Sequence, residues 1–186
     1  MTEKEIIKTS KYLSLVLRHE PELVGLKLDE AGWVAVEALL HAMNQHGVPL
    51  TSALLQHIVA TSDKKRFAVS EDGLRIRANQ GHSVEVDLQY EPKVPPALLY
   101  HGTATRFLDS IRQNGLLRME RHDVHLAAET KVTLQVGGRH GKPVLLVIRA
   151  GEMHKAGHVF RRSANGVWLV NHVPPQFIEF PANETL

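Results

Sequence analysis

Three prolines, at positions 92, 95 and 96, most strongly constrain how this chain of 186 residues can fold. Proline lacks a backbone N–H and has a fixed φ, so this stretch neither propagates a helix nor occupies a central strand. The surrounding segment from Ser83 to Ala97 is acidic and has the composition of a linker. We therefore expect a boundary near Glu91 to Pro96, with domains at residues 1–92 and 97–186.

The composition excludes several classes of protein. With 43% hydrophobic and 23% charged residues, the chain has an ordinary globular composition. It contains no cysteine, which excludes disulfides, thiolate zinc sites, iron–sulfur clusters and a cysteine nucleophile. No apolar run approaches the roughly 20 residues that span a bilayer, and the N-terminus lacks the pattern of a signal peptide. We expect a cytoplasmic protein with no membrane contact and no obligatory protein partner.

The charge is unevenly distributed along the chain. Residues 1–93 carry 11 basic and 13 acidic residues, whereas residues 94–186 carry 11 and 7. The net charge of the whole chain is only +2. This balance is compatible with an anionic substrate that is bound by a few placed cations rather than by a general basic field.

Helix signals dominate the first 60 residues. Thr2 and Glu5 have the spacing of a capping box and begin an amphipathic run that must end before Pro21. Two further helices are predicted, at about residues 34–45, ended by a glycine at 47, and at about 51–60, capped by Thr51.

A β-hairpin is predicted after these helices. Residues 66–70 and 74–78 alternate apolar and polar side chains on either side of a Glu-Asp-Gly turn. The alternation predicts a buried face formed by Phe67, Val69, Leu74 and Ile76. The opposite face is then basic and is formed by Arg66, Arg75 and Arg77. Three helices followed by a hairpin predict a winged-helix domain.

The signals after the linker are shorter. They predict one helix at about residues 104–114, ended by Gly115, and strands at 98–101, 124–126, 143–149, 167–170 and 177–180. Few helices and many short strands favour a compact α+β domain rather than alternating βαβ units.

Three familiar motifs are absent. Residues 137–143 resemble a phosphate-binding loop, but their glycine spacing is one residue short and proline follows the lysine. No G-x-G-x-x-G opens a helix after a strand, so a Rossmann site for NAD is unsupported. His122 and His125 would point to opposite faces of a strand, and no third ligand is evident, so we expect no metal site.

Several residues at the ends of predicted elements admit two interpretations. Arg18 and His19 could simply complement the dipole at the end of the first helix. His101-Gly102-Thr103 is either an ordinary strand end or a place where glycine lets a ligand approach the backbone. From the residues alone, the chain is a two-domain protein with Arg and His concentrated at the ends of its elements.

Seven sets of residues, in order along nearly the whole chain, resemble the RNA 2′-phosphotransferase family. They are Ser10-Lys11-Tyr12-Leu13-Ser14 with Leu17-Arg18-His19 and Pro21; Leu28-Asp29 with Gly32-Trp33; Ser62-Asp63-Lys64-Lys65-Arg66-Phe67; Ile76-Arg77-Ala78 with Gln80-Gly81-His82-Ser83; Leu99-Tyr100-His101-Gly102-Thr103; Val124-His125-Leu126; and Asn165-Gly166-Val167-Trp168-Leu169.

The resemblance implies a winged-helix lobe joined to an ADP-ribosyltransferase-like lobe that binds NAD without a Rossmann fold. It also implies two chemical steps. An RNA 2′-phosphate displaces nicotinamide from NAD, and the ribose 2″-hydroxyl of the intermediate then attacks the phosphorus. The products are RNA with a 2′-hydroxyl, ADP-ribose 1″,2″-cyclic phosphate and nicotinamide. A non-catalytic winged-helix RNA-binding protein is the alternative.

The family's site residues carry over onto this chain by motif. The resemblance implies a catalytic set that consists of Arg18, His19, Arg66 and Arg121. It also implies an NAD-binding set that consists of His101, Gly102, Thr103, His125 and Val167. NAD is then a co-substrate, the partner is RNA carrying a 2′-phosphate, and no metal is used. One position departs from the family pattern, because Ala127 stands where a small hydroxyl residue is expected.

Overall fold

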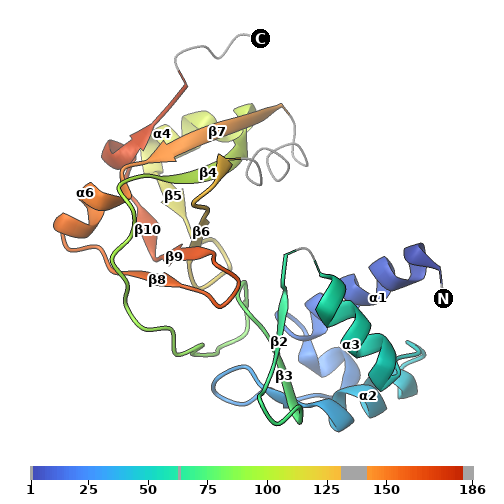
Figure 1. The fold of residues 1–186 in the computed structure, drawn as a ribbon. Coiled ribbons are helices and arrows are strands. Elements are labelled where there is room, and N and C mark those ends of the chain that lie inside the picture. Colours follow the sequence, from blue (N-terminus) through green and yellow to red (C-terminus); the bar gives the residue numbers. More distant parts are fainter. Residues whose placement is uncertain (1, 63, 131–141, 182–186) are drawn as a thin grey trace. The chain divides into compact units, whose positions relative to one another are not determined.

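The computed structural model describes residues 2–62, 64–130 and 142–181 (Figure 1). It has mixed helix and sheet content, as the predicted α+β class requires. The chain divides into two compact units, Met1–Gln89 and Tyr90–Leu186, and each is described by itself. No described helix is both long and apolar enough to cross a membrane. Most of the stretch that resembles a phosphate-binding loop, at residues 137–141, lies outside the described residues.

Three helices form most of the first unit. Helix α1 (Glu3–Val16) begins with the predicted capping box, in which Thr2 and Glu5 each accept a hydrogen bond from the other's backbone N–H. A 3₁₀ turn η1 (Pro21–Val24) follows, as do α2 (Val36–Gln45) and α3 (Ser52–Thr61). Leu13, Val16 and Leu17 are fully buried, which confirms the predicted apolar face of the first helix.

The second helix begins two residues later than predicted. Val34–Ala35 form a short strand, β1, which pairs with β3 (Arg75–Ala78) so that Val34 lies opposite Ile76. The predicted hairpin is present as β2 (Phe67–Val69) and β3, and the order of the small sheet is β1-β3-β2. The sequence did not reveal β1 because the partner that makes it a strand lies about 40 residues away.

The prediction for the buried face of the hairpin is only half correct. Phe67 and Ile76 are buried, but Val69 and Leu74 are 39% and 65% exposed. Both exposed residues lie near the turn of the hairpin and do not belong to the apolar core, which contains Phe67 and Ile76. Alternation along a strand predicts which side a residue faces, but not whether the core extends far enough to cover it.

The basic face of the hairpin is partly a structural element. The guanidinium carbons of Arg75 and Arg77 lie 5.5 and 4.6 Å from the ring centroid of Trp33, at cation–π distance. Arg77 also donates hydrogen bonds to the carbonyls of Ala31 and Leu88. Arg77 therefore attaches the chain on both sides of the hairpin instead of standing free on a basic face.

The described residues of the second unit form three small sheets around one apolar core (Figure 1). The sheet β11-β7-β4 joins Ile178–Glu179, Pro143–Ile148 and Leu99–Ala104, whereas the sheet β6-β9-β8 joins Val124–Leu126, Trp168–Val170 and Phe160–Arg162. A third pair joins β10 (His172–Val173) and β5 (Leu116–Leu117). Outside residues 131–141, the helical elements include η2 (Thr105–Phe107), α4 (Leu108–Asn114), α6 (Ala150–Lys155) and η4 (Pro175–Phe177).

Every strand predicted in this half is present. The strand at residues 124–126 has the predicted bounds, whereas the ends of the others differ by one to three residues. The first extends to Ala104, so the predicted start of the helix at 104 is instead the end of β4, and α4 itself begins at Leu108. The prediction omitted α6, the three-residue strand β8 and the two-residue strands β5 and β10. These elements are too short for their own periodicity to identify them.

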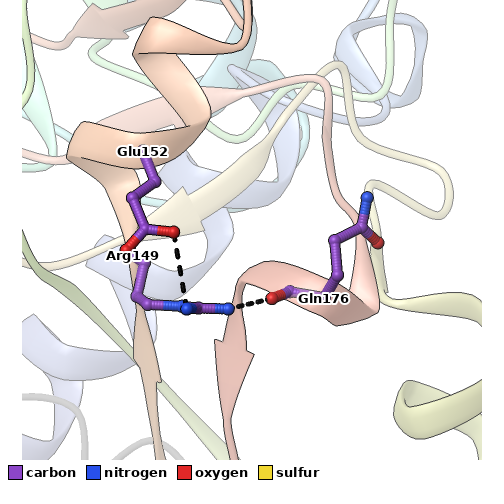
Figure 2. Close-up of polar contacts among 3 residues, drawn as sticks. All are labelled: Arg149, Glu152 and Gln176. Carbon is purple, nitrogen blue, oxygen red and sulfur yellow. Dashed lines mark hydrogen bonds and ion pairs between the residues drawn. The ribbon is translucent and has the colours of Figure 1, made fainter.

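Arg149 connects three elements of this unit. It follows the last residue of β7, and Figure 2 shows its guanidinium between Glu152 of α6 and the main-chain carbonyl of Gln176 in η4. The ion pair with Glu152 measures 3.4 Å, while the other guanidinium nitrogen donates to the carbonyl. The backbone N–H of Arg149 also donates to Phe177, at 2.9 Å. One side chain thus fixes the turn from strand into helix.

Candidate functional site

Arg18 and His19 lie in the turn that ends the first helix. The backbone N–H of His19 donates to the carbonyl of Leu15 at 2.9 Å, so this turn continues the helical hydrogen bonding. A distant segment then fastens it: the N–H of Ser83 donates to the carbonyl of Arg18, at 2.9 Å. The hydroxyl of Ser83 and Nδ1 of His19 share a hydrogen bond of 2.9 Å, which orients the imidazole ring.

Arg66 lies at the start of the hairpin. Its guanidinium and its backbone N–H both donate to the hydroxyl of Ser62, each at 3.4 Å. Directly after β3, the N–H of Asn79 donates to the carbonyl of Arg66 at 2.9 Å. The buried Asn79 side-chain amide donates to the carbonyl of Lys65 at 2.6 Å. Arg66 is therefore attached to the sheet through Asn79 and to the end of α3 through Ser62.

The segment from Asn79 to Ser83 links these two places. Asn79 binds the backbone of Arg66, and Ser83 binds the backbone of Arg18, only four residues further on. Four residues of extended chain span at most about 14 Å. Gly81, at φ +88°, lets the segment turn, a conformation that glycine adopts at little cost. Three of the predicted catalytic residues, Arg18, His19 and Arg66, thus share one region of the first unit.

A second group of candidate residues lies where three strands of the second unit meet. Tyr100 of β4 and Ala127, just after β6, exchange two backbone hydrogen bonds of 2.8 and 2.9 Å. Next to this bridge, Nδ1 of His101 hydrogen-bonds to the carbonyl of His125 at 3.0 Å. Because a carbonyl only accepts, His101 carries its proton on Nδ1 and presents Nε2 as an acceptor when the ring is neutral.

Burial and charge both favour the neutral form of His101. Burial lowers the pKa of this imidazole, and the positive charge of Arg121 lowers it further, against the opposing effect of the hydrogen bond to His125. At neutral pH the ring is therefore an uncharged hydrogen-bonding group.

Arg121 joins the same cluster from the loop before β6. One of its guanidinium nitrogens lies 3.4 Å from Nδ1 of His125, and arginine can only donate, so this imidazole nitrogen is the acceptor. The turn containing Arg121 is closed by its N–H, which donates to the carbonyl of Arg118. Arg121, His125 and His101 form a continuous series of contacts that places a fixed cation beside two histidines.

The remaining predicted NAD-binding residues lie on the same strands. His101 and Thr103 project to one side of β4, since side chains two residues apart share a face, and Gly102 between them pairs with Leu145 of β7. Thr103 is 9% exposed. Val167 immediately precedes β9, and the register that pairs Leu126 with Trp168 brings it beside Ala127 at the end of β6.

An acidic residue lies beside this cluster. Burial raises the pKa of the Asp123 carboxyl, while the charges of Arg161, His122 and Arg118 oppose the rise. His122 precedes the strand, which begins at Val124, so it belongs to the loop. Within residues 2–62, 64–130 and 142–181, no three His, Asp or Glu side chains are grouped as metal ligands would be.

The sequence alone did not reveal the residues that hold the candidate side chains. Ser62, Asn79 and Ser83 fix Arg66, His19 and the turn after α1. Ser62 and Ser83 occurred in the motif strings, but no local pattern gave them a role. Ser83 and His19 are 64 residues apart in the chain, and only the fold brings them into contact.

The fold and these contacts define an α+β protein in which Arg66, His101 and Arg121 are hydrogen-bonded to a hydroxyl, a carbonyl and an imidazole nitrogen respectively. Comparison with known proteins identifies the family. The family model of RNA 2′-phosphotransferase, Tpt1/KptA family, matches residues 4–172. The chain therefore belongs to the RNA 2′-phosphotransferase family.

Curated relatives match over nearly their full length. A protein of Streptomyces griseus is 55% identical over 185 residues, covering 96% of this chain and 98% of the relative. A protein of Pseudomonas aeruginosa is 55% identical over 179 residues, with the same coverage. A protein of Nostoc punctiforme is 50% identical, covering 96% of this chain and 99% of the relative. Each is named a probable RNA 2′-phosphotransferase.

Proposed function

We propose that this protein is an NAD-dependent transferase that removes an internal 2′-phosphate from RNA and transfers it to ADP-ribose. The observation that supports this most directly is the contact series in the second unit. Arg121 contacts the ring of His125, and His101 contacts its carbonyl. A cation proposed for phosphate binding is therefore a neighbour of two histidines that are proposed for NAD binding and lie 24 residues apart in the chain.

The proposal includes a role for each part of the chain. Residues 1–92, with three helices and a hairpin, are a winged-helix lobe that handles RNA and phosphate. Residues 97–186, with short strands around one core, are an ADP-ribosyltransferase-like lobe that binds NAD as co-substrate. Both lobes contribute residues to the reaction, because the catalytic set comes from both.

In the first step, an oxygen of the RNA 2′-phosphate attacks C1″ of the nicotinamide ribose. The bond from C1″ to the pyridinium nitrogen breaks, and its electron pair neutralises the departing nicotinamide. The phosphate is already anionic, so the protein needs to position it rather than deprotonate it. Arginine suits this task because its planar guanidinium makes two parallel hydrogen bonds to phosphate.

In the second step, the ribose 2″-hydroxyl attacks the phosphorus of the RNA–phospho–ADP-ribose intermediate. The hydroxyl loses its proton, the bond from phosphorus to the RNA 2′-oxygen breaks, and that oxygen gains a proton. Negative charge increases on the phosphoryl oxygens, where Arg18, Arg66 and Arg121 stabilise it. His19 is the group among the four that can transfer a proton near neutral pH.

NAD is held by residues on β4 and beside β6 and β9. Neutral His101 offers Nε2 as an acceptor for a ribose hydroxyl, and Gly102 brings backbone close to the ligand. Thr103, His125 and Val167 complete the contact surface. The arginines supply the positive charge that the phosphoryl transfer needs, so we expect activity to survive EDTA.

The test uses full-length variants in which each catalytic residue is replaced in turn by alanine. Each variant reacts with NAD and with RNA that bears one internal 2′-phosphate, under single-turnover conditions with the protein in excess over the RNA. Nicotinamide release reports the first step, and loss of the phosphate from RNA reports the second. We expect Arg18→Ala, His19→Ala, Arg66→Ala and Arg121→Ala to slow the second step more than the first, by about 10²- to 10³-fold, the cost of a lost oxyanion donor. The intermediate should then accumulate as a slower-migrating RNA.

Two results would contradict the proposal at different levels. If every variant abolishes nicotinamide release with no intermediate at any time, the four residues act in the first step and their roles are wrong. If the wild-type chain binds RNA but releases no nicotinamide, the protein is a non-catalytic RNA-binding protein.

A further inference from the structure

A pocket of about 370 Å³ lies in the second unit, and none of His101, His125 and Arg121 lines it. One side is formed by the residues that follow the first unit, and the other by the turn between β8 and β9. Its lining consists of Tyr90, Lys93, Arg162, Ser163, Ala164 and Gly166.

Backbone hydrogen bonds fix both sides of this pocket. Pro92 forms a β-bridge with Arg161, and the N–H of Lys93 donates to the carbonyl of Phe160 at 2.8 Å, so this segment runs along β8. On the other side, the buried hydroxyl of Ser163 accepts from the N–H of Val167 at 3.0 Å and closes the turn. Backbone hydrogen bonds therefore hold both segments that form the pocket.

The charged groups at the pocket are both cations. Lys93 and Arg162 are exposed, and no acidic residue lines the pocket. Within the part of the chain that the structure describes, neither forms an ion pair. The Arg162 guanidinium lies 5.8 Å from the ring centroid of Trp168, and a Cβ added at Gly166 would be 3.4 Å from its Nη2. The aromatic ring and the glycine turn hold the guanidinium in place without neutralising it.

We propose that this pocket binds an internal phosphate group carrying one negative charge. Lys93 supplies a mobile ammonium and Arg162 an oriented planar donor, a pair that suits a phosphate with two free oxygens. Gly166 lines the pocket and is directly followed by Val167, so the pocket adjoins one of the residues proposed to bind NAD. This inference rests on the proposed function, which supplies two molecules that contain such a phosphate: an RNA strand with its phosphodiesters, and NAD with its pyrophosphate.

The experiment measures binding and needs no turnover. A fluorescein-labelled single-stranded RNA without a 2′-phosphate is titrated with the full chain at several salt concentrations and followed by anisotropy, and NAD binding is measured by calorimetry. The test variants are the double substitution Lys93→Gln with Arg162→Gln, and Ala164→Glu, which places a carboxylate at the pocket. The control is Lys155→Gln with Arg112→Gln, which removes the same charge elsewhere in the same unit.

If the pocket binds RNA, both test variants weaken RNA binding at least fivefold, and NAD binding is unchanged. The slope of log K against log salt for the double variant then falls by about 0.7 to 1.4, the value for one or two lost contacts to single-stranded phosphates. If the pocket binds the pyrophosphate, NAD binding weakens at least fivefold and RNA binding is unchanged. Either result supports the phosphate site.

The inference is overturned if the test variants and the control change both affinities by the same factor. Thermal unfolding of each variant shows whether it is folded, and Ala164→Glu keeps the test valid if the double variant is not. The result is independent of the proposed reaction, because RNA without a 2′-phosphate binds whether or not the chain releases nicotinamide from a phosphorylated substrate.

Discussion

Replacing Ser83 with alanine removes the hydroxyl that shares a 2.9 Å hydrogen bond with Nδ1 of His19. The main-chain contact from Ser83 to the carbonyl of Arg18 remains, so the turn after α1 is preserved. A hydrogen bond of this kind contributes about 0.5 to 1.5 kcal/mol net. If all of it orients His19 for the second chemical step, that step slows by about 2- to 13-fold, since 1.36 kcal/mol corresponds to a factor of ten.

The assay is a single-turnover reaction of the full chain with NAD and 2′-phosphorylated RNA, in which nicotinamide release and decay of the intermediate are timed separately. We expect Ser83→Ala to slow decay of the intermediate and to leave nicotinamide release nearly unchanged. Ser83→Thr keeps a hydroxyl and should restore most of the rate. Ser110→Ala, an exposed serine of α4, controls for loss of a hydroxyl elsewhere.

Two outcomes would refute the reasoning. The first is an equal slowing of both steps, which would mean that Ser83 affects substrate binding rather than the orientation of His19. The second is a loss in Ser83→Thr as large as in Ser83→Ala, because the hydroxyl would then not be the group that matters. Thermal unfolding should differ little among these variants, since Ser83 is exposed.

Three further predictions concern stability and pH. Arg149→Met should lower the free energy of unfolding, measured with urea, by about 1 to 2 kcal/mol, because it removes a charged donor to the carbonyl of Gln176. Glu152→Gln should lower it by under about 1 kcal/mol, because the Glu152 side chain is 57% exposed. Gly115→Ala should lower the free energy of unfolding by about 3 kcal/mol or more, because Gly115 has φ +75° and an added Cβ would lie 2.1 Å from the carbonyl oxygen of Val173. Gly157 also has a positive φ, but an added Cβ would have nothing within 4 Å, so Gly157→Ala should lower it by about 1 kcal/mol in the same assay. The pKa of His101 is lowered in the folded state, so the free energy of unfolding should fall as pH drops from 6.5 to that lower pKa, by up to about 1.4 kcal/mol per pH unit. In urea unfolding, His101→Asn should lack this part of the pH dependence.

Local signals in the sequence predicted those elements whose ends are set by nearby residues. The capping box of Thr2 and Glu5 and the Thr51 cap fixed the starts of two helices, because these hydrogen bonds span only three residues. The Glu-Asp-Gly turn likewise located the hairpin, since a tight turn determines which residues pair.

The elements and contacts that sequence reasoning missed depend on partners far along the chain. β1 is a strand because Val34 pairs with Ile76, and its two residues have no periodicity of their own. The ring of His101 is oriented by the carbonyl of His125, which lies 24 residues away. Motif resemblance supplied the candidate residues, but only the fold shows which neutral groups hold them.

The identity of those neutral groups matters for phosphate chemistry. Arg66 donates to a hydroxyl and Arg121 to an imidazole nitrogen, and neither forms an ion pair with any residue that the structure describes. A carboxylate would orient a guanidinium more strongly, but it would also cancel the charge that a phosphate needs. A hydrogen bond to a neutral acceptor still orients the side chain, with a net contribution of about 1 kcal/mol per bond. It leaves the full positive charge of the guanidinium available. In the proposed reaction, a bound phosphate would become the counter-ion of these arginines, as stabilisation of developing negative charge requires.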